Sequence, residues 1–270
     1  MKITVLIKQV PETSGVQMDP QTGTLVRRGD TAIVNPLDLY GIETALRLKE
    51  RCGAETSALS MGPPAAESAL REAMAMGIDD AALATDRAFA GSDTWATARI
   101  LAAAVRALPV PDLIICGERA TDGDTGQVGP ELAAALDLPI ATYVRKVLAF
   151  DADSITVERA TEHGVATLKL ALPAVITVLK EIGEPRLPTL DGKIRARGAK
   201  LTLLSQAELK LPPEEIGLKG SPTRVVKIFH PQVGRKCRMM TTETDARIAE
   251  AAGALCSMLR ERGLVGRAER

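Results

Sequence analysis

The sequence predicts an α/β protein: a parallel β-sheet with helices on both faces, an antiparallel meander insertion and an extended C-terminal arm. Three observations lead to this fold class. Short, β-branched apolar segments alternate with helix-like segments over the first half of the chain. Three strand-like segments separated by polar turns follow Tyr143, and hydrophobic periodicity weakens from Gly183 onward. We therefore expect a Rossmann-like domain over 1–205, with the meander at about 144–172, and a C-terminal arm and helix over 206–270.

The first elements follow from local signals. Ile3–Ile7 is apolar and β-branched, as in a strand that is buried on both faces. Val16–Arg27 contains DPQTG between extended stretches and predicts a hairpin excursion. Asn35 and Pro36 then open a helix, with Asn35 as the N-cap and Pro36 at the first helical position, and this helix ends near Gly53.

The strand–helix alternation continues with the same regularity. Each expected strand is short and apolar, and each expected helix begins at a capping residue or a Pro-containing turn. The strands are Thr56–Ser60, Ala81–Thr85 and Asp112–Cys116. The first helix of this stretch is Ala65–Met76, which Gly77 closes, the second is Thr94–Leu108, which Asp93 caps, and the third is Gln127–Leu136. This repeat predicts right-handed crossovers and hence a parallel sheet.

The second half of the chain has a different pattern. VRKVLAF, SITVERA and VATLKLAL predict the meander, because turns at 151–153 and 162–164 separate them. Ala174–Leu179 is expected to return to the main sheet. Leu211–Arg238 has little pattern and predicts an extended arm, which a final helix over Glu243–Arg262 follows.

Composition excludes several classes of function. The 270 residues carry 34 basic and 34 acidic side chains, so the formal net charge is zero, and only 2% are aromatic. A neutral chain with few aromatic residues has neither the charge nor the stacking platforms of a nucleic-acid-binding protein. Two histidines without a carboxylate cluster predict no metal site. We find no pairing of a nucleophile with a base, so no catalytic side chain is assigned.

Cysteine usage and the apolar runs bear on localisation. The four cysteines are far apart and form no C-x-x-C pair, which favours reduced thiols over a zinc site or a disulfide framework. MKITVLIKQV lacks the organisation of a signal peptide, and no apolar run reaches membrane-spanning length. We therefore expect a cytoplasmic protein that does not insert into membranes.

The ends of the predicted strands form a candidate ligand site. In an open parallel sheet, ligands bind beyond the carboxyl ends of the strands. Those ends are Lys8–Gln9, Met61–Pro63, Gly91–Thr94 and Gly117–Gly126, with Asn35 where the excursion rejoins the sheet. Most of them combine Gly or a capping residue with a helix start, which suits a phosphate group.

The glycine-rich loop Gly117–Gly126 is the sharpest of these places. Its glycines let the backbone approach a ligand, and Thr125 and Gln127 add side-chain donors. Asp122 and Asp124 would repel a phosphate, so we expect them to cap the following helix or to hold loop N–H groups. The loop matches neither a P-loop nor G-x-G-x-x-G, and spacing alone does not distinguish it from a capped turn that binds nothing.

Five segments together resemble a known family. VLIKQVPE, NPLDLYGIETALRLKE, LSMGPPAAESALREAMAMG, ICGERATDGDTGQVGPELAAALDLP and LPAVITVLKEIGEPRLPTL occur in the order and at the spacing found in the beta subunit of electron-transfer flavoprotein. The resemblance covers essentially the whole chain. HPQVGRKCRMM in the C-terminal region does not align with the family.

The resemblance implies partners and a cofactor. The beta subunit forms a heterodimer with an alpha subunit that carries FAD, and we expect the arm and helix over 206–270 to wrap that subunit. The heterodimer docks on an acyl-CoA dehydrogenase or a related flavoenzyme. The beta subunit's own nucleotide site holds AMP as a structural ligand in one branch of the family. In the electron-bifurcating branch it holds a second FAD that takes hydride from NADH. One electron then goes to a low-potential acceptor such as ferredoxin or flavodoxin, and the other passes to the alpha-subunit FAD.

Two segments favour the bifurcating branch. DGDTGQVGP and GSDTWATA resemble the bifurcating members more than the members that hold AMP. Small residues at Gly123 and Gly126 leave room for a diphosphate, and the helix start at Ser92–Thr94 is placed to face the remainder of a flavin nucleotide.

The resemblance also assigns site residues. Leu190, within EPRLPTLDG, corresponds to the leucine that anchors in the partner dehydrogenase, although it also suits an ordinary loop position. The expected cofactor-binding residues are Leu6, Lys8, Asn35, Pro36, Asp38, Met61, Asp93, Thr94, Gly117, Arg119, Ala120, Thr121, Asp122, Gly123, Asp124, Thr125, Gly126, Gln127 and Val128.

Two other classes of protein use a similar sheet. A stress-type ATP-binding signalling module would be stable alone or as a homodimer, and the meander and the arm argue against it. An adenylating enzyme would need an S-G-G-x-D-S-like loop after the first strand, where this chain has KQVPETSG.

Overall fold

A computed structural model of the chain describes residues 1–12, 16–18, 25–27, 32–224, 237 and 239–265. The chain divides into two compact units, Met1–Arg224 and Val225–Arg270. This division lies further along the chain than the expected domain boundary at 205/206. Among the described residues, none of the helices has the length and apolar character needed to cross a lipid bilayer.

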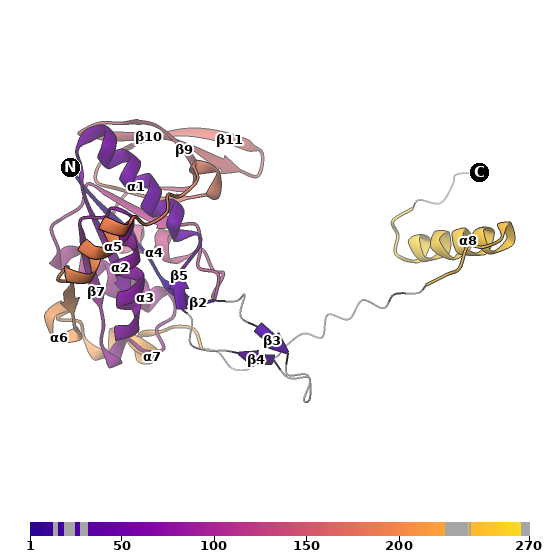
Figure 1. The fold of residues 1–270 in the computed structure, drawn as a ribbon, viewed down its shortest axis with the longest axis horizontal. Helices are drawn as coiled ribbons and strands as arrows, with labels where there is room; N and C mark the ends of the chain where they lie inside the picture. The colour runs from indigo at the N-terminus through magenta and orange to yellow at the C-terminus, as the bar shows by residue number, and fades with distance from the viewer. Residues whose placement is uncertain (13–15, 19–24, 28–31, 225–236, 238, 266–270) are drawn as a thin grey trace. The chain divides into compact units, whose positions relative to one another are not determined.

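A nine-stranded sheet organises the first unit and confirms the predicted fold class (Figure 1). Its spatial order is β11-β10-β9-β12-β8-β1-β6-β7-β13. The strands are β1 (Lys2–Leu6), β6 (Glu55–Met61), β7 (Asp80–Ala84), β8 (Leu113–Gly117), β9 (Ile140–Phe150), β10 (Ser154–Thr161), β11 (Gly164–Ala171), β12 (Ala174–Val178) and β13 (Thr202–Leu204). Neighbouring strands from β9 to β13 in this order are parallel, and only the β9–β10–β11 meander is antiparallel.

The strand order reverses beside β1. The chain runs outward from β1 through β6 to β7 and then returns to pair β8 with the other side of β1. Val5 of β1 lies opposite Ala58 on one side and Ile115 on the other. Such a reversal opens a crevice at the carboxyl ends of the strands, so the sheet has a natural place for a ligand between β1 and β8.

Helices cover both faces of this sheet. The helices α1 (Asp38–Cys52), α2 (Glu67–Met76) and α5 (Leu190–Gly198) pack on one face. The helices α3 (Thr94–Ala107), α4 (Val128–Leu136) and α6 (Gln206–Leu209) pack on the other. Alternate strand residues divide between two cores: Ile3 and Val5 belong to the first, and Ile114 and Cys116 to the second. This two-sided burial explains why the central strands are continuously apolar.

Shorter elements connect these layers. Two antiparallel pairs, β2 (Gln9–Pro11) with β5 (Ala32–Val34) and β3 (Val16–Met18) with β4 (Leu25–Arg27), form the expected excursion. Its predicted turn, DPQTG, lies outside the described residues. Four 3₁₀ turns are also described: η2 (Pro64–Ala66), η3 (Arg87–Phe89), η4 (Lys180–Ile182) and η5 (Pro213–Glu215).

The residues after Gly183 contain more structure than periodicity indicated. Helix α5, strand β13, α6 and the short α7 (Gly217–Gly220) all belong to the first unit. In α5 only Ala196 is buried, so a helix that exposes almost every side chain carries no apolar period to detect. The second unit contains α8 (Asp245–Glu261), which Thr244 caps, and this confirms the predicted final helix.

Candidate functional site

A cavity of about 350 Å³ lies at the carboxyl ends of the strands, where the strand order reverses beside β1. The carboxyl ends of β1, β6 and β8 form its floor, and the first residues of α3 and α4 form its walls. Its volume falls in the range of small-molecule sites. The lining residues are Leu6, Ile7, Lys8, Asp38, Leu59, Met61, Ser92, Asp93, Thr94, Thr97, Leu101, Cys116, Gly117, Glu118, Arg119, Ala120, Gly123, Thr125, Gly126, Gln127, Val128 and Gly129.

Glycine is required at two points of the loop that follows β8. A Cβ atom on Gly117 would overlap Asp38 Oδ1 and the backbone of Leu37, so only glycine lets the strand end approach α1. Gly126 has a φ of +64°, and a Cβ atom there would lie 3.3 Å from the carbonyl oxygen of Glu118. At these two positions the loop backbone packs so closely against its neighbours beside the cavity that a side chain would not fit.

Asn35 braces this loop instead of capping α1, which corrects the sequence prediction. Its Nδ2 donates to the carbonyl oxygen of Arg119 at 2.9 Å, and its Oδ1 accepts from the N–H of Thr121 at 3.1 Å. Helix α1 begins at Asp38, and Leu37, in the N-cap position, makes no side-chain capping bond. A fully buried amide satisfies more hydrogen-bonding groups between the two segments than it would at the helix start.

The two loop aspartates neither cap α4 nor hold loop N–H groups, so that prediction was wrong. Asp122 forms an ion pair with Lys8 at 2.8 Å, and Asp124 forms one with Arg119 at 2.9 Å. Gln127 occupies the N-cap of α4 without a side-chain capping bond. Each acid therefore neutralises a basic side chain that lines the cavity.

Asp38 links both strand ends to α1 from inside the cavity wall. Its Oδ2 accepts from the N–H of Lys8 at 2.7 Å. Burial raises the pKa of Asp38 from 3.8 to about 7, against the lowering effect of hydrogen bonds from Asn35 and the Lys8 backbone. Burial also raises the pKa of the Cys116 thiol, with a smaller contribution from Asp38, so Cys116 lines the cavity as a neutral group.

The start of α3 forms the opposite wall. Asp93 caps the helix, as predicted, by accepting from the N–H of Ala96 at 3.0 Å. The hydroxyl of Thr94 lies 3.1 Å from Glu131 Oε1 and 3.4 Å from Gln127 Oε1, so it joins the starts of α3 and α4. Burial raises the pKa of Glu131, and its buried Oε2 has no hydrogen-bond partner among the described residues.

Most of the predicted cofactor-binding residues line one cavity. Asn35, Pro36, Thr121, Asp122 and Asp124 do not, and at least three of them hold residues that do. The contribution of each residue to ligand binding stays a prediction.

Sequence reasoning missed the apolar part of the site. Thr97 and Leu101 follow Thr94 at helical spacing, and Leu59 precedes Met61 at strand spacing. These periods place each residue on the same face as a predicted neighbour and would have identified them. The other missed lining residues are Ile7, Cys116 and Gly129, whereas Ser92 and Glu118 lie within the predicted helix start and loop.

Leu190 lies in a different part of the first unit. It is the first residue of α5, which Thr189 caps, and its side chain is 74% exposed. The predicted docking leucine is thus at a helix start, directly after an extended segment.

Comparison with known proteins now defines the class. The family model of the electron transfer flavoprotein domain matches residues 22–209. The chain therefore belongs to the electron-transfer flavoprotein family, and within it the chain is a beta subunit. This membership sets aside the signalling-module and adenylating alternatives.

Three relatives illustrate the match. The chain is 44% identical over 266 residues to the electron transfer flavoprotein subunit beta of Thermoanaerobacterium thermosaccharolyticum, covering 98% of this chain and 100% of the relative. It is 41% identical over 266 residues to the caffeyl-CoA reductase-Etf complex subunit CarD of Acetobacterium woodii, with the same coverage. It is 43% identical to protein FixA of Azotobacter vinelandii over 262 residues, which cover 93% of each chain.

Proposed function

We propose that this chain is the beta subunit of an electron-bifurcating electron-transfer flavoprotein and binds FAD in the cavity between β1 and β8. The observation that carries the proposal is that the glycine loop and the Ser92–Thr94 helix start line the same cavity. Two helix starts then line one cavity, an arrangement that suits the two phosphates of a dinucleotide. The similarity to CarD, whose name places it in a reductase-Etf complex, supports this choice.

The residues present fit such a cofactor. The absence of a side chain at Gly126 lets the loop backbone reach the cavity, and Lys8 and Arg119, each paired with a loop aspartate, line it as hydrogen-bond donors. The apolar residues Leu6, Leu59 and Leu101 give the remainder of the cavity a surface that excludes water. When bound, the flavin supplies the redox chemistry, accepting hydride from NADH and passing electrons to two acceptors. This chain binds the cofactor, orients it and keeps water out.

The proposal includes partners. The alpha subunit would bind the second FAD, and the heterodimer would deliver one electron to an acyl-CoA dehydrogenase or related flavoenzyme. The other electron would go to a low-potential acceptor such as ferredoxin or flavodoxin. The alternative is a beta subunit that holds AMP structurally and carries no redox cofactor of its own.

Ligand stoichiometry separates these alternatives. We expect the purified heterodimer to release two FAD and no AMP on denaturation. One FAD and one AMP per heterodimer would contradict bifurcation and would leave the family assignment intact. The measurement is chromatography of the released ligands against the protein concentration.

A substitution in the loop tests the location of the site. Gly126→Glu adds bulk and negative charge where a φ of +64° and the Glu118 carbonyl leave no room. We expect it to remove one nucleotide per heterodimer. Gly198→Glu is the matched control, because it makes the same change outside the cavity, at the end of α5, where a Cβ atom meets nothing within 4 Å. Full nucleotide content in the Gly126→Glu heterodimer would refute the assignment of the loop.

A further inference from the structure

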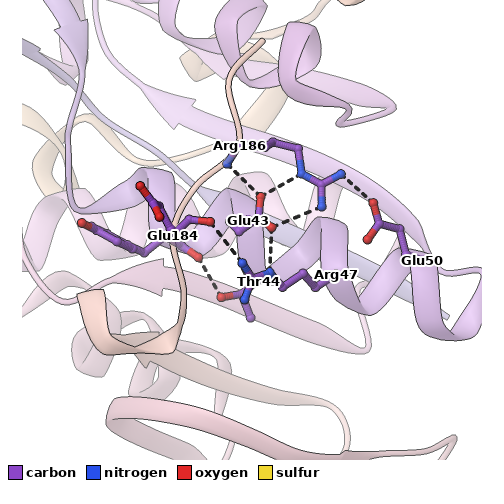
Figure 2. A network of polar contacts seen from close by, with 7 residues as sticks. Glu43, Thr44, Arg47, Glu50, Glu184 and Arg186 are labelled. Carbon is purple, nitrogen blue, oxygen red and sulfur yellow. Dashed lines mark hydrogen bonds and ion pairs between the residues drawn. The ribbon is translucent and has the colours of Figure 1, made fainter. Parts of the chain in front are cut away.

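A buried carboxylate on α1 holds the segment that precedes α5 (Figure 2). Glu43 is 4% exposed and accepts three hydrogen bonds from Arg186. The Arg186 backbone N–H donates to Glu43 Oε2 at 3.1 Å, Nε donates to the same oxygen at 2.8 Å, and Nη2 donates to Oε1 at 3.2 Å. Both the main chain and the guanidinium of Arg186 are therefore fixed by one side chain.

A second arginine extends this clamp, which we define as Glu43, Arg47 and Arg186. Arg47 Nε donates to Glu43 Oε1 at 2.7 Å, and its Nη2 donates to the carbonyl oxygen of Glu184 at 3.1 Å. Gly183 makes the approach possible, since a Cβ atom there would overlap the Arg47 guanidinium. The contacts reach the chain at residues 184 and 186, so they hold its backbone at two points (Figure 2).

The two arginines stabilise the buried charge of Glu43. Burial works to raise the pKa of Glu43, but hydrogen bonds from Arg186 and Arg47 outweigh it and leave the pKa below its usual value. Removing one partner of such a pair leaves a buried charge without compensation. Glu50, by contrast, pairs with Arg186 Nη1 at 2.6 Å from a mostly exposed position, where an ion pair contributes little.

The clamp leads directly into an exposed apolar segment. Leu187, Leu190 and Ile194 are 84%, 74% and 62% exposed. Beyond them the chain is fixed again, because Arg195 Nη2 donates to the carbonyl oxygen of Met74 at 2.7 Å, at the end of α2. The segment 187–194 is thus held at both ends and presents three large apolar side chains between them.

Helix α1 connects this segment to the cofactor cavity. Asp38, its first residue, lines the cavity, and Glu43 follows five positions later on the same helix. A helix is rigid over this length, so the segment and the cavity share one reference element.

We infer that Glu43 and Arg186 are positioning residues that fix the start of the apolar segment 187–194 on α1 for docking to an apolar pocket of the partner flavoenzyme. The inference rests on the proposed function, because that function makes the segment a docking site. A segment ordered before contact loses less freedom on binding, so the clamp increases affinity without touching the partner.

The experiment uses the full heterodimer and an acyl-CoA dehydrogenase that exchanges electrons with the wild-type protein. Arg186→Lys keeps the charge but loses the planar fork to Glu43. We expect it to raise the KM for the heterodimer about tenfold, to change kcat little and to leave flavin content intact, as lost binding without lost chemistry predicts. Glu43→Gln is the second variant, and it keeps the shape of the side chain. Glu50→Gln is the matched control and should leave KM unchanged.

Hydrogen exchange of the backbone amides of 187–193, measured without the dehydrogenase, reports the positioning itself. We expect faster exchange in Arg186→Lys and Glu43→Gln and wild-type exchange in Glu50→Gln. Leu190→Ala tests docking separately and should raise KM without faster exchange. If Leu190→Ala raises KM and both clamp variants behave as wild type, positioning is refuted and docking stands. If Leu190→Ala leaves KM unchanged, docking at this segment fails, and the inference fails with it.

Discussion

At the residue scale, Asp38 connects the ends of two neighbouring strands to the start of α1. Its carboxyl accepts from the backbone N–H of Lys8 after β1 and lies against Gly117 at the end of β8. Short side chains with several acceptors suit such a junction, because they satisfy backbone groups that a reversal of strand order leaves unpaired. The same position makes Asp38 the most strongly perturbed carboxyl that lines the cavity.

Asp38 should give the stability of the protein a defined pH dependence. Its pKa is about 7 in the folded chain and near 3.8 when unfolded, so the folded state binds the proton more tightly between these values. The contribution of Asp38 to the free energy of unfolding is greatest below about pH 4, where the carboxyl is protonated in both states. It falls by a few kcal/mol in total as the pH rises to 7. Asp38→Asn does not titrate, and its Tm advantage over wild type should grow from pH 5 to pH 8. Parallel Tm curves for the two proteins would contradict this.

At the element scale, the start of α3 shows how one cap can serve two purposes. Asp93 Oδ1 caps the helix, and Oδ2 accepts from the N–H and the hydroxyl of Thr223 at 2.9 and 2.8 Å. The buried Ser221 hydroxyl accepts from the Asp93 N–H at 2.8 Å. The cap therefore joins the cavity wall to the last residues of the first unit.

Removing the Asp93 side chain should destabilise both α3 and the last residues of the first unit. We expect Asp93→Ala to lower the unfolding free energy by about 1 to 2 kcal/mol for the cap, with a further loss from the Thr223 bonds. Thermal unfolding measures the first effect, and faster trypsin cleavage after Lys219 and Arg224 measures the second. Thr244→Ala removes the cap of α8 in the other compact unit and serves as the control. Wild-type cleavage in Asp93→Ala would show that the bonds to Thr223 do not hold the segment.

At the scale of the whole molecule, residues beyond position 205 complete the hydrophobic core of the first unit. Leu209 and Ile216, which are 8% and 2% exposed, pack into the core that includes α3 and α4. Both lie beyond residue 205, in the part of the chain that was expected to belong to the arm. The second unit has no buried residue in α8, so this helix has no core of its own among its described residues.

Truncation distinguishes the two boundaries. A chain ending at Arg224 should fold with a cooperative thermal transition, whereas a chain ending at Ser205 should unfold at lower temperature, because it uncovers the face that Leu209 and Ile216 cover. We also expect the chain ending at Arg224 to lose co-purification with the alpha subunit, because it lacks most of the region 206–270 that is expected to wrap that subunit. Equal Tm values for the two truncated chains would contradict the structural boundary, and retained co-purification would contradict the wrapping.

The sequence by itself determined the parallel sheet, the meander and the location of the cavity. Apolar runs such as Ile3–Ile7 and caps such as Asp93 are local signals, and in a parallel sheet the ends of the strands mark where a ligand binds, whereas the reversal of strand order beside β1 is visible only in the structure. It also determined the family, because five motifs in order carry more information than one loop.

Only the tertiary structure decided what individual polar side chains do. Asn35 and Asp122 carry the local signature of capping residues, yet they bind partners far away in the chain, Arg119 and Lys8. In the sequence Glu43 likewise looks like an ordinary helix carboxylate, and only the fold shows that Arg186 lies beside it. Secondary structure follows from neighbours in sequence, but a polar side chain bonds whichever group the fold brings within reach. A buried polar group needs such a partner, because leaving it without a hydrogen bond costs free energy.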